Sequence, residues 1–356
     1  MKKRIKQLLL ILLVVAIAYL TLYPVPIDPE AWTPGVNIGF TGIYSPNNEL
    51  SKIQKMADGQ CPQCEDLAID SSGNVYASAS DGRILAFSPD FKEFNTIVNT
   101  GGRPLGMITD NQGNIYVADD TKGLLWVSTK GEMKVLSNAY NNQKMLFVDD
   151  LTFAPDSSII FTEASRKFPD KTFVLDIIEH RPNGNMFRYY LKTGKTELLM
   201  DSLYFANGVA VSADGSYVLV NNMNKYQVLK HFLSGENKGK TEVFADNLPG
   251  FPDGVNIGPD GIIWVSIPTL RIELLDKVLP YPFLRKLILR IPQPEQKKHP
   301  YGFILGFDSS GKLIHNLQDP TGGYSGITNV VPFQNKLYLG SINEKSIGIY
   351  ELPKNN

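Results

Sequence analysis

The chain has almost no cysteine and almost no excess of charge. Its 356 residues include two cysteines, so a framework of several disulfides is excluded. Thirty-five Lys and Arg against 36 Asp and Glu leave a net charge of −1, which argues against a dedicated nucleic-acid-binding protein. With 43% hydrophobic and 20% charged residues, the composition excludes wholesale disorder. Long apolar runs are also missing, except for one at the N-terminus.

That run carries the pattern of a targeting segment. Basic residues come first, at Lys2, Lys3, Arg4 and Lys6, and the uncharged stretch LLLILLVVAIAYLTLY follows. The pattern fits a cleaved signal peptide or an uncleaved anchor, and the stretch ends in Pro24 and Pro26 rather than in the small residues of a cleavage site. We therefore predict a cytoplasmic segment at 1–7, a single transmembrane signal anchor at 8–27, and the remainder on the extracytoplasmic side.

The rest of the chain repeats one pattern of strands. Each copy has a short alternating strand, a turn such as Asp-Gly or Ser-Gly-Asn, and a second strand rich in β-branched and aromatic residues, before further strands. The copies begin at Glu65, Leu105, Asp149, Asn207, Asp253 and Ser325. A four-stranded unit returning every ~40–50 residues is typical of a β-propeller blade. No linker interrupts the repeat, which argues against two β-sandwich domains.

The sequence thus predicts an all-β, six-bladed propeller over residues 36–356. Residues 36–60 are expected to supply the outer strand that closes the ring. One stretch, 269–300, falls outside the repeat and places Leu274, Leu275, Val278 and Leu279 at helical spacing. It predicts one or two amphipathic helices inserted in the fifth blade. They either cap the blades or contact the membrane, since one apolar stripe serves both purposes.

Oxygen-bearing side chains recur at one position of the repeat. The first strand of each blade lines the central channel, so equivalent residues converge there. Four of the six residues at the start of that strand carry carboxylate or amide oxygens: Glu65, Asp149, Asn207 and Asp253. Three carboxylates in one channel repel one another unless a cation joins them. Asn-Gly and Asp-Gly pairs are also common turn sequences, but oxygen ligands without His or Cys favour Ca²⁺, with Mg²⁺ or Mn²⁺ as alternatives.

Several segments in order resemble a known superfamily of propellers. They are RPLGMITDNQGNIYVADDTKGLLWV, FVDDLTFAPDSSIIFTEAS, FANGVAVSADGSYVLV and LPGFPDGVNIGPDGIIWVS. The chain resembles the strictosidine synthase-like, gluconolactonase and paraoxonase-type propellers, and most of all the strictosidine synthase-like members. The resemblance implies metal ligands at Glu65, Asp149, Asn207 and Asp253, with Asp149 standing where the family has Asn. It also implies a second, structural calcium ion near Asp66 and Asp150.

Two departures from the family limit the chemistry that can be transferred. Paraoxonases place a catalytic His at the start of the second blade, where this chain has Arg103. Strictosidine synthase uses a Glu before its last inner strand, and the matching stretch near Ser325, SGITNVVPF, contains none. This absence argues against a C–N condensing lyase. The four histidines lie outside the repeated position, and we expect them on the surface or on outer strands. For His180 a second place stays open, because its insertion, DIIEHRPNG, could fold over the channel.

The leading hypothesis is a calcium-dependent hydrolase of small-molecule esters or lactones, of arylesterase or lactonase type. The metal would polarise the carbonyl, and a carboxylate would activate water: Asp149 first, Glu65 second. The alternative is a propeller that binds a ligand or partner without catalysis. Cys61-Pro-Gln-Cys64 leads into a strand rather than a helix, so we expect a local disulfide more than a redox motif, although so short a loop would be strained.

Overall fold

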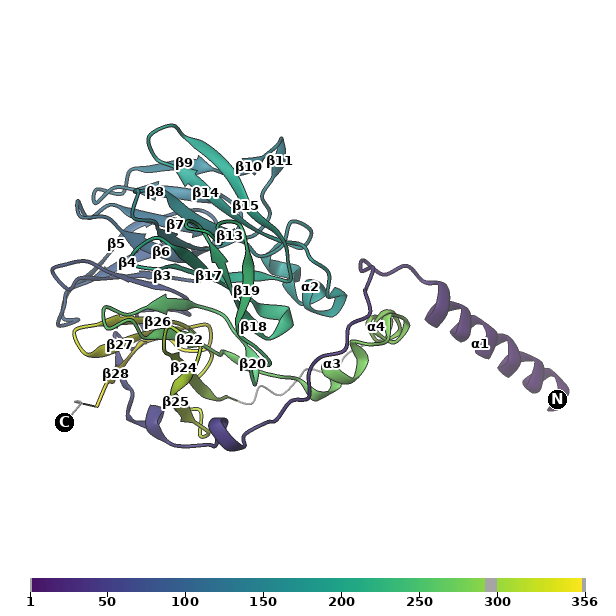
Figure 1. The fold of residues 1–356 in the computed structure, drawn as a ribbon. Helices are drawn as coiled ribbons and strands as arrows, with labels where there is room; N and C mark the ends of the chain where they lie inside the picture. The colour runs from purple at the N-terminus through teal and green to yellow at the C-terminus, as the bar shows by residue number, and fades with distance from the viewer. Residues whose placement is uncertain (1, 292–299, 354–356) are drawn as a thin grey trace.

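The computed structural model describes residues 2–291 and 300–353, and its body is a six-bladed β-propeller. Six four-stranded antiparallel sheets make up the blades (Figure 1). Neighbouring first strands contact one another in the order β2, β6, β12, β16, β21, β26 and back to β2, which closes the ring. The fold predicted from the repeat is confirmed.

In each blade the strands pair in chain order. Blade one contains β2 (Leu67–Ile69), β3 (Val75–Ser78), β4 (Arg83–Phe87) and β5 (Phe94–Asn99). Blade two contains β6 (Pro104–Thr109), β7 (Ile115–Asp119), β8 (Gly123–Val127) and β9 (Met133–Ser137). Blade three contains β12 (Val148–Phe153), β13 (Ile159–Glu163), β14 (Gly184–Tyr190) and β15 (Lys195–Leu203). Blade four contains β16 (Ala206–Val211), β17 (Tyr217–Asn222), β18 (Gln227–Phe232) and β19 (Thr241–Ala245).

The last two blades depart slightly from this plan. Blade five contains β21 (Val255–Ile257), β22 (Ile263–Ser266), β24 (Gly302–Phe307) and β25 (Leu313–Asp319). Blade six contains β26 (Ile327–Phe333), β27 (Lys336–Ser341), β28 (Ile347–Glu351) and, from the N-terminal side, β1 (Gln54–Met56). The strand from residues 36–60 therefore pairs with the C-terminal strand as predicted, and no sheet edge is left at the closure.

Short elements decorate this ring. The two small ribbons are β10 (Ala139–Tyr140) with β11 (Gln143–Lys144), and β20 (Gly250–Phe251) with β23 (Thr269–Leu270). The helices are α1 (Lys2–Leu22), α2 (Phe173–Glu179), α3 (Glu273–Val278) and α4 (Pro282–Leu289). Single 3₁₀ turns are η1 (Gly42–Tyr44), η2 (Glu49–Lys52), η3 (Asp170–Thr172) and η4 (Met223–Lys225).

The tight turns follow directly from the sequence. Between the first two strands of blade two, the Asp110 carboxylate accepts hydrogen bonds from the amides of Gln112 and Asn114, both at 2.9 Å. Gly113 has φ +79°, a left-handed conformation that glycine adopts without a Cβ clash. Asp70 and Gly73 build the same turn in blade one. The repeated Asp-x-x-Gly-Asn pattern therefore fixes where the first two strands of these blades turn.

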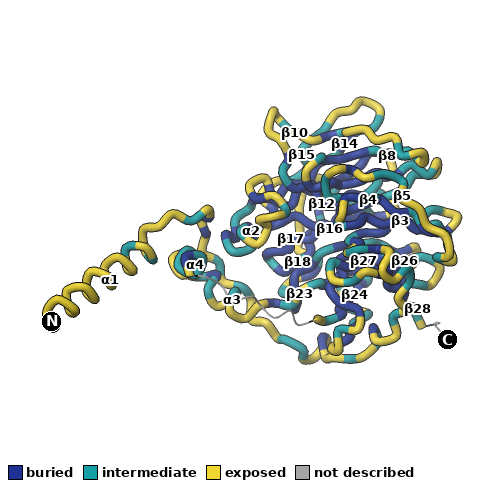
Figure 2. Tube along the Cα trace, turned by 180° about the vertical axis from the view of Figure 1, so that it is seen from behind, coloured by how far each residue is buried: buried dark blue, intermediate teal, exposed yellow. Residues whose placement is uncertain are grey.

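Apolar side chains between the blades form the core. Figure 2 shows the inner strands of the ring buried and α1 exposed along most of its length. Trp264 is fully buried in a cluster with Ile304 from its own blade and Leu339 from blade six. Burial of this kind contributes roughly 25 cal/mol per Å² of apolar surface, so packing between blades stabilises the ring that positions the channel.

The N-terminal helix differs from the predicted anchor in its limits. α1 begins at Lys2, inside the basic segment, and ends at Leu22, and it is apolar and long enough to span a membrane. It does not extend to Ile27, which is 4% exposed and packed on the propeller. Pro24 and Pro26 explain the difference, because proline cannot continue a helix and disfavours helical geometry in the residue before it.

The inserted helices leave the ring at one end of the channel. Glu163 at the end of β13 pairs with Val148 at the start of β12, so the connection that carries α2 begins beside Asp149. Likewise the Asp253 amide donates to the carbonyl of Ser266, where β22 ends and the connection with α3 and α4 begins. Figures 1 and 2 place α2, α3 and α4 on the side of the ring nearest α1.

Candidate metal centre

The starts of the six inner strands form two layers of residues on the channel. The register of the first strand shifts at this point in blades two, three, four and six. Such bulges re-aim side chains. The first layer comprises Glu65, Leu105, Asp149, Asn207, Asp253 and Thr328, and the second comprises Asp66, Gly106, Asp150, Gly208, Gly254 and Asn329.

Hydrogen bonds between neighbouring blades show which residue of each blade belongs to which layer. The amide of Gly208 donates to the carbonyl of Asp253, and the amide of Gly254 donates to the carbonyl of Thr328, both at 2.8 Å. Thr328 therefore holds the first-layer position of blade six, and the prediction of Ser325 there was wrong by three residues. The physical reason is that β26 begins at Ile327, later than an alignment of a degenerate repeat without gaps places it.

The four predicted ligands line one small cavity. Its volume is about 10 Å³, close to the space one water molecule occupies. Its lining residues are Glu65, Asp66, Gly106, Asp149, Asp150, Asn207, Asp253, Gly254, Thr328 and Asn329. Leu105 and Ser325 are not among them, and neither is any described residue of 269–300. The structure thus brings Glu65, Asp149, Asn207 and Asp253 together, and the insertion does not fill the cavity.

Burial and mutual repulsion raise the pKa values of the carboxyl groups in the first layer. Burial raises the pKa of Glu65 to about 7, with a further contribution from the charge of Asp150. Burial, followed by the charges of Glu65 and Asp253, raises the pKa of Asp149 well above its usual range. Burial and Glu65 likewise raise the pKa of Asp253. Carboxylates that are costly to ionise together are stabilised by a cation.

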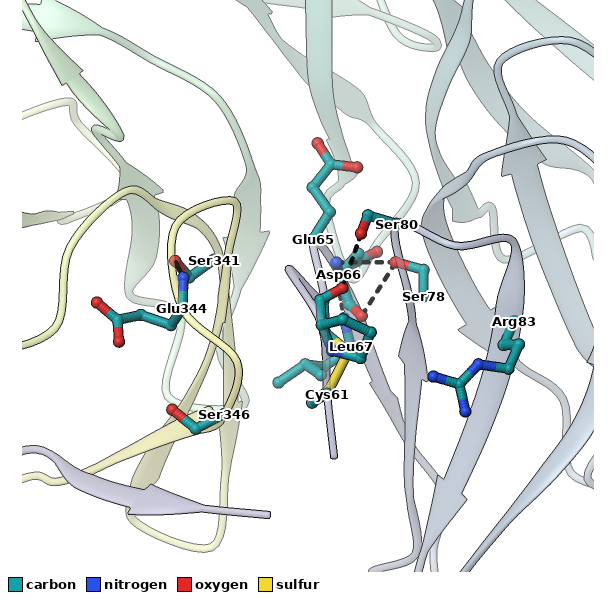
Figure 3. Close-up of a disulfide and its surroundings, with 12 residues drawn as sticks. Cys61, Glu65, Asp66, Leu67, Ser78, Ser80, Arg83, Ser341, Glu344 and Ser346 are labelled. Carbon is teal, nitrogen blue, oxygen red and sulfur yellow. Dashed lines mark hydrogen bonds between the residues drawn. A yellow bond between two sulfur atoms is a disulfide. The ribbon is translucent and has the colours of Figure 1, made fainter. Parts of the chain in front are cut away.

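One carboxylate oxygen has no partner. Glu65 Oε2 is buried and receives no hydrogen bond from the described part of the chain. In Figure 3 the Glu65 side chain extends away from the disulfide between Cys61 and Cys64, whereas the main chain of Asp66 is bonded to Ser78. The disulfide closes the turn just before Glu65, and its buried sulfurs lie in the blade-one core.

The donor set fits a hard divalent cation. The four first-layer side chains offer carboxylate and amide oxygens, as Ca²⁺ prefers, and the unpaired Glu65 oxygen is available to a ligand. Within residues 2–291 and 300–353, however, no three His, Cys, Asp or Glu side chains stand close enough to make a metal-binding group by themselves. The amide of Asn207 therefore belongs in the candidate ligand set.

The second layer is hydrogen-bonded in a different way. Asp150 accepts from the amides of Leu151 and Val209, both at 2.8 Å, so its two oxygens join blade three to blade four. Asp66 does the same between blades one and two, accepting from Leu67 and Met107 at 2.6 Å. Backbone donors thus already occupy Asp66 and Asp150, the residues implied for a second calcium ion.

Arg103 is a charged neighbour of the cavity whose place sequence reasoning missed. Its guanidinium pairs with Asp170 of η3, and its amide donates to Asp120 at 3.2 Å. Burial opposes its charge, but Glu65 and Asp170 outweigh burial and raise the pKa of Arg103 above its ordinary value. Arg103 thus places a fixed positive charge near Glu65. The available signal was its position directly before the second inner strand.

The histidines lie away from the cavity wherever the structure describes them. His231 and His315 are on β18 and β25, as expected for outer strands, and His299 lies outside the described residues. His180 is 1% exposed and stacks on Trp32 with ring centroids 4.4 Å apart, so the expectation of a surface or outer-strand position was wrong for it. The N-terminal segment covers it, which the repeat pattern does not predict.

Comparison with known proteins places this arrangement in a family. A family model of strictosidine synthase matches residues 149–236, and a model of the N-terminal part of strictosidine synthase-like proteins matches residues 42–87. Adipocyte plasma membrane-associated protein of Bos taurus is 31% identical over 349 residues, covering 90% of this chain and 84% of the relative. The chain belongs to the strictosidine synthase-like family.

Another member of the family matches most of the chain, and more distant propellers share its fold. Strictosidine synthase-like protein 10 of Arabidopsis thaliana is 31% identical over 81% of this chain and 85% of its own length. A gluconolactonase of Xanthomonas campestris superposes with a TM-score of 0.63 at 16% identity, covering 86% of this chain and 91% of that chain. Regucalcin of Agrobacterium tumefaciens, described as a calcium-binding protein, superposes with a TM-score of 0.61 at 14% identity, covering 84% and 93%. At such identities these structures support the fold alone.

Proposed function

We propose that this family member is a membrane-anchored, calcium-dependent hydrolase of esters or lactones. The observation that carries the proposal is the cavity of about 10 Å³ where Glu65, Asp149, Asn207 and Asp253 meet from four blades. The unpaired Glu65 oxygen and the raised pKa values of the carboxyl groups support a cation there. The names of the gluconolactonase and the calcium-binding regucalcin agree with this chemistry.

The residues of the cavity have different proposed roles in hydrolysis. The chemistry that a calcium ion would supply when bound is Lewis-acid polarisation of a carbonyl oxygen. Glu65, Asn207 and Asp253 would hold it, together with Asp149. The Asp149 carboxylate takes the proton of the attacking water, because it lines the cavity beside the proposed ion and the family has a neutral Asn at this position. Arg103 favours the ionised form of Glu65, which suits Glu65 better as a ligand than as the base.

The proposed orientation places the propeller outside the cytoplasm. α1 is 21 residues long, about 32 Å at 1.5 Å per residue, and its uncharged part, 8–22, covers about 22 Å, so spanning a hydrocarbon core of ~30 Å requires the basic side chains of its first turns to reach out to the headgroups. The basic residues Lys2, Lys3, Arg4 and Lys6 precede its apolar part and favour a cytoplasmic N-terminus. A disulfide between Cys61 and Cys64 suits an oxidising compartment.

Hydrolysis by the purified full-length chain tests the proposal. Phenyl acetate and a panel of lactones are assayed with calcium, with EDTA, and after calcium is restored. We expect EDTA to abolish turnover and calcium to restore it, and Asp149→Asn to lose it. Asp90→Asn, an exposed aspartate of blade one, is the matched control. Absence of turnover, or turnover indifferent to both EDTA and Asp149→Asn, would reject the hydrolase.

One observation favours a second function, the binding of a ligand without catalysis. The cavity itself has space for an ion, and any larger ligand would bind outside it, at the mouth of the channel. In that case calcium is a structural ion, and the mouth of the channel binds a ligand or partner. Calorimetric titration separates the two: calcium binding with no turnover of any ester or lactone supports this alternative. The C–N condensing lyase gains no support, because the stretch SGITNVVPF contains no Glu.

A further inference from the structure

We infer that the insertion formed by α3 and α4 rests on the lipid bilayer that α1 enters, with Leu274, Tyr281 and Phe283 in the headgroup region. The inference adds a second membrane contact to the proposed anchor and rests on α1 being that anchor. It concerns the described residues 273–290 only. The argument starts from the contact between α4 and the end of α1.

Arg290, just after α4, binds the end of the N-terminal helix. Its Nε donates to the carbonyl of Tyr23 at 2.6 Å, and its Nη1 donates to the carbonyl of Leu20 at 3.0 Å. Leu20 lies in the last turn of α1 and Tyr23 directly follows the helix, where carbonyls lack intrahelical donors. The apolar run ends at this point, so the contact places Arg290 at the depth where α1 leaves the hydrocarbon. Tyr19 and Tyr23 lie there with ring centroids 5.0 Å apart, and tyrosine is enriched at membrane interfaces.

A second arginine of α4 fixes the insertion to the propeller. Arg285 is fully buried, and its Nη1 donates to the carbonyls of Ile178 and Glu179 at 2.8 and 2.9 Å, at the end of α2. Its Nη2 donates to the carbonyl of Glu30. The short helix α4 thus contacts α1 through one arginine and the propeller through another, so the position of the insertion against the bilayer is set by both.

The exposed side of the insertion carries several large apolar side chains beside the exposed Glu273–Lys277 ion pair. Leu279 is 1% exposed, and Leu275 packs against the core. Leu274, Tyr281 and Phe283, by contrast, are 61%, 57% and 56% exposed. Amphipathic helices with such residues lie roughly 5–10 Å into the boundary between headgroups and acyl chains.

Two lysines in the described part of the insertion are paired with carboxylates. Lys277 binds Glu273 at 2.5 Å, and Lys286 binds Asp28 at 3.3 Å. Paired charges give anionic lipid little additional attraction. The contact should therefore depend on apolar burial, and it should form on zwitterionic phosphatidylcholine.

Depth-dependent quenching tests the inference in the full chain, reconstituted in phosphatidylcholine vesicles. The two native cysteines are joined in a disulfide, so a new cysteine is the one site for an environment-sensitive fluorophore. The test positions are Leu274→Cys and Phe283→Cys. Val135→Cys is the matched control on β9, 52% exposed, and Leu12→Cys reports α1. Lipids with a doxyl group near the headgroup or deep in the acyl chain are the quenchers.

The expected result is a fluorescence loss of about twofold or more at 274 and 283 with the shallow quencher, and none at 135. Leu12→Cys should respond most to the deep quencher. If 274 and 283 behave like 135 while Leu12→Cys is quenched, α1 is an anchor but the insertion does not touch lipid. That result overturns the inference. It is also the result expected if a protein partner or a second copy of the chain, rather than lipid, occupies this surface. If Leu12→Cys is unquenched too, the anchor itself fails, and the inference fails with it.

Discussion

Glu65 and Asp66 are neighbours in the chain, and so are Asp149 and Asp150, yet the two members of each pair lie in different layers of the channel. Both oxygens of Asp66 and of Asp150 accept backbone amides, including one from the next blade. Glu65, by contrast, keeps a buried oxygen with no partner in the described chain. Both layers contain buried carboxylates with raised pKa values.

The difference shows that residue type and burial do not separate a ligand from a structural carboxylate. Hydrogen bonding does, because a buried oxygen with two backbone donors has little capacity left, whereas an unpaired one is costly unless something binds it. The first layer is therefore suited to bind a cation and the second to join the blades. Four experiments test this contrast.

The largest effect is expected from removing a first-layer charge. Asp149→Asn should lower turnover by about 10²–10³-fold, because the base and one anionic ligand are lost together. Its free energy of unfolding in EDTA should stay the same or rise, since a repelling charge is gone. Steady-state kinetics and urea unfolding check the two parts. A large loss of stability in Asp149→Asn would place this residue with the structural layer.

The converse substitution is made in the second layer. Asp150→Ala leaves the amides of Leu151 and Val209 without their acceptor, so we expect the free energy of unfolding to fall by about 3 kcal/mol. Urea unfolding in EDTA measures this without any contribution from calcium. If Asp150→Ala is as stable as the parent chain, backbone bonding does not define the second layer.

The dependence on pH is expected to be smaller, and calcium should change it. Folding raises the pKa of Glu65 from 4.5 to about 7, so the calcium-free folded state binds more protons than the unfolded state in that window. The contribution of Glu65 to stability must then fall as pH rises from 4.5 to 7, by at most about 1.4 kcal/mol per pH unit, whereas buried His180, whose pKa folding lowers to about 2, contributes the opposite slope below pH 6.5.

Calcium binds the ionised carboxylates, so its stabilising effect should grow over the same pH range. Thermal unfolding with calcium and with EDTA at several pH values checks both trends. Acidic residues with lowered pKa values, such as Asp90 and Asp214, contribute below this window and do not obscure it. A calcium effect that is equal at pH 5 and pH 7 would contradict a carboxylate site.

The smallest effect is expected at the blade-six position of the first layer. The Thr328 hydroxyl donates to the main-chain carbonyl of Glu65 at 2.6 Å. This bond joins blades six and one and leaves the Glu65 carboxylate free to bind an ion. Thr328→Val should cost about 1 kcal/mol of stability and change calcium affinity by no more than about twofold. Calorimetric titration of calcium measures the second quantity. A tenfold loss of affinity would make Thr328 a ligand.

Much of this arrangement could be predicted from the sequence. Equivalent residues of a repeated blade must converge on the axis, so the spacing of the copies predicted that Glu65, Asp149, Asn207 and Asp253 would share a cavity. The Asp-x-x-Gly-Asn turns are local and could also be predicted. The prediction failed in blade six because this copy of the repeat is degenerate, and an alignment without gaps placed Ser325, three residues before Thr328, at the first-layer position.

What lay beyond the sequence depends on contacts between distant segments. The pairing of Arg103 with Asp170 and the covering of His180 by Trp32 join parts of the chain that no repeat relates. The contact of Arg290 with the end of α1 joins residues some 270 positions apart. Periodicity predicted the amphipathic helices of 269–300 but did not decide whether they cap the blades or face the membrane.

The sequence by itself therefore determined the strands, their turns, the number of blades and the apolar N-terminal helix, because each depends on local patterns that repeat or run on without interruption. The tertiary structure decided which carboxylates were left unpaired and which face of the insertion stayed exposed. It also decided where the chain after α1 begins to pack on the propeller. Hydrogen-bond satisfaction and burial are properties of the whole packed ring, and neighbours such as Glu65 and Asp66 differ in them although the chain presents them side by side.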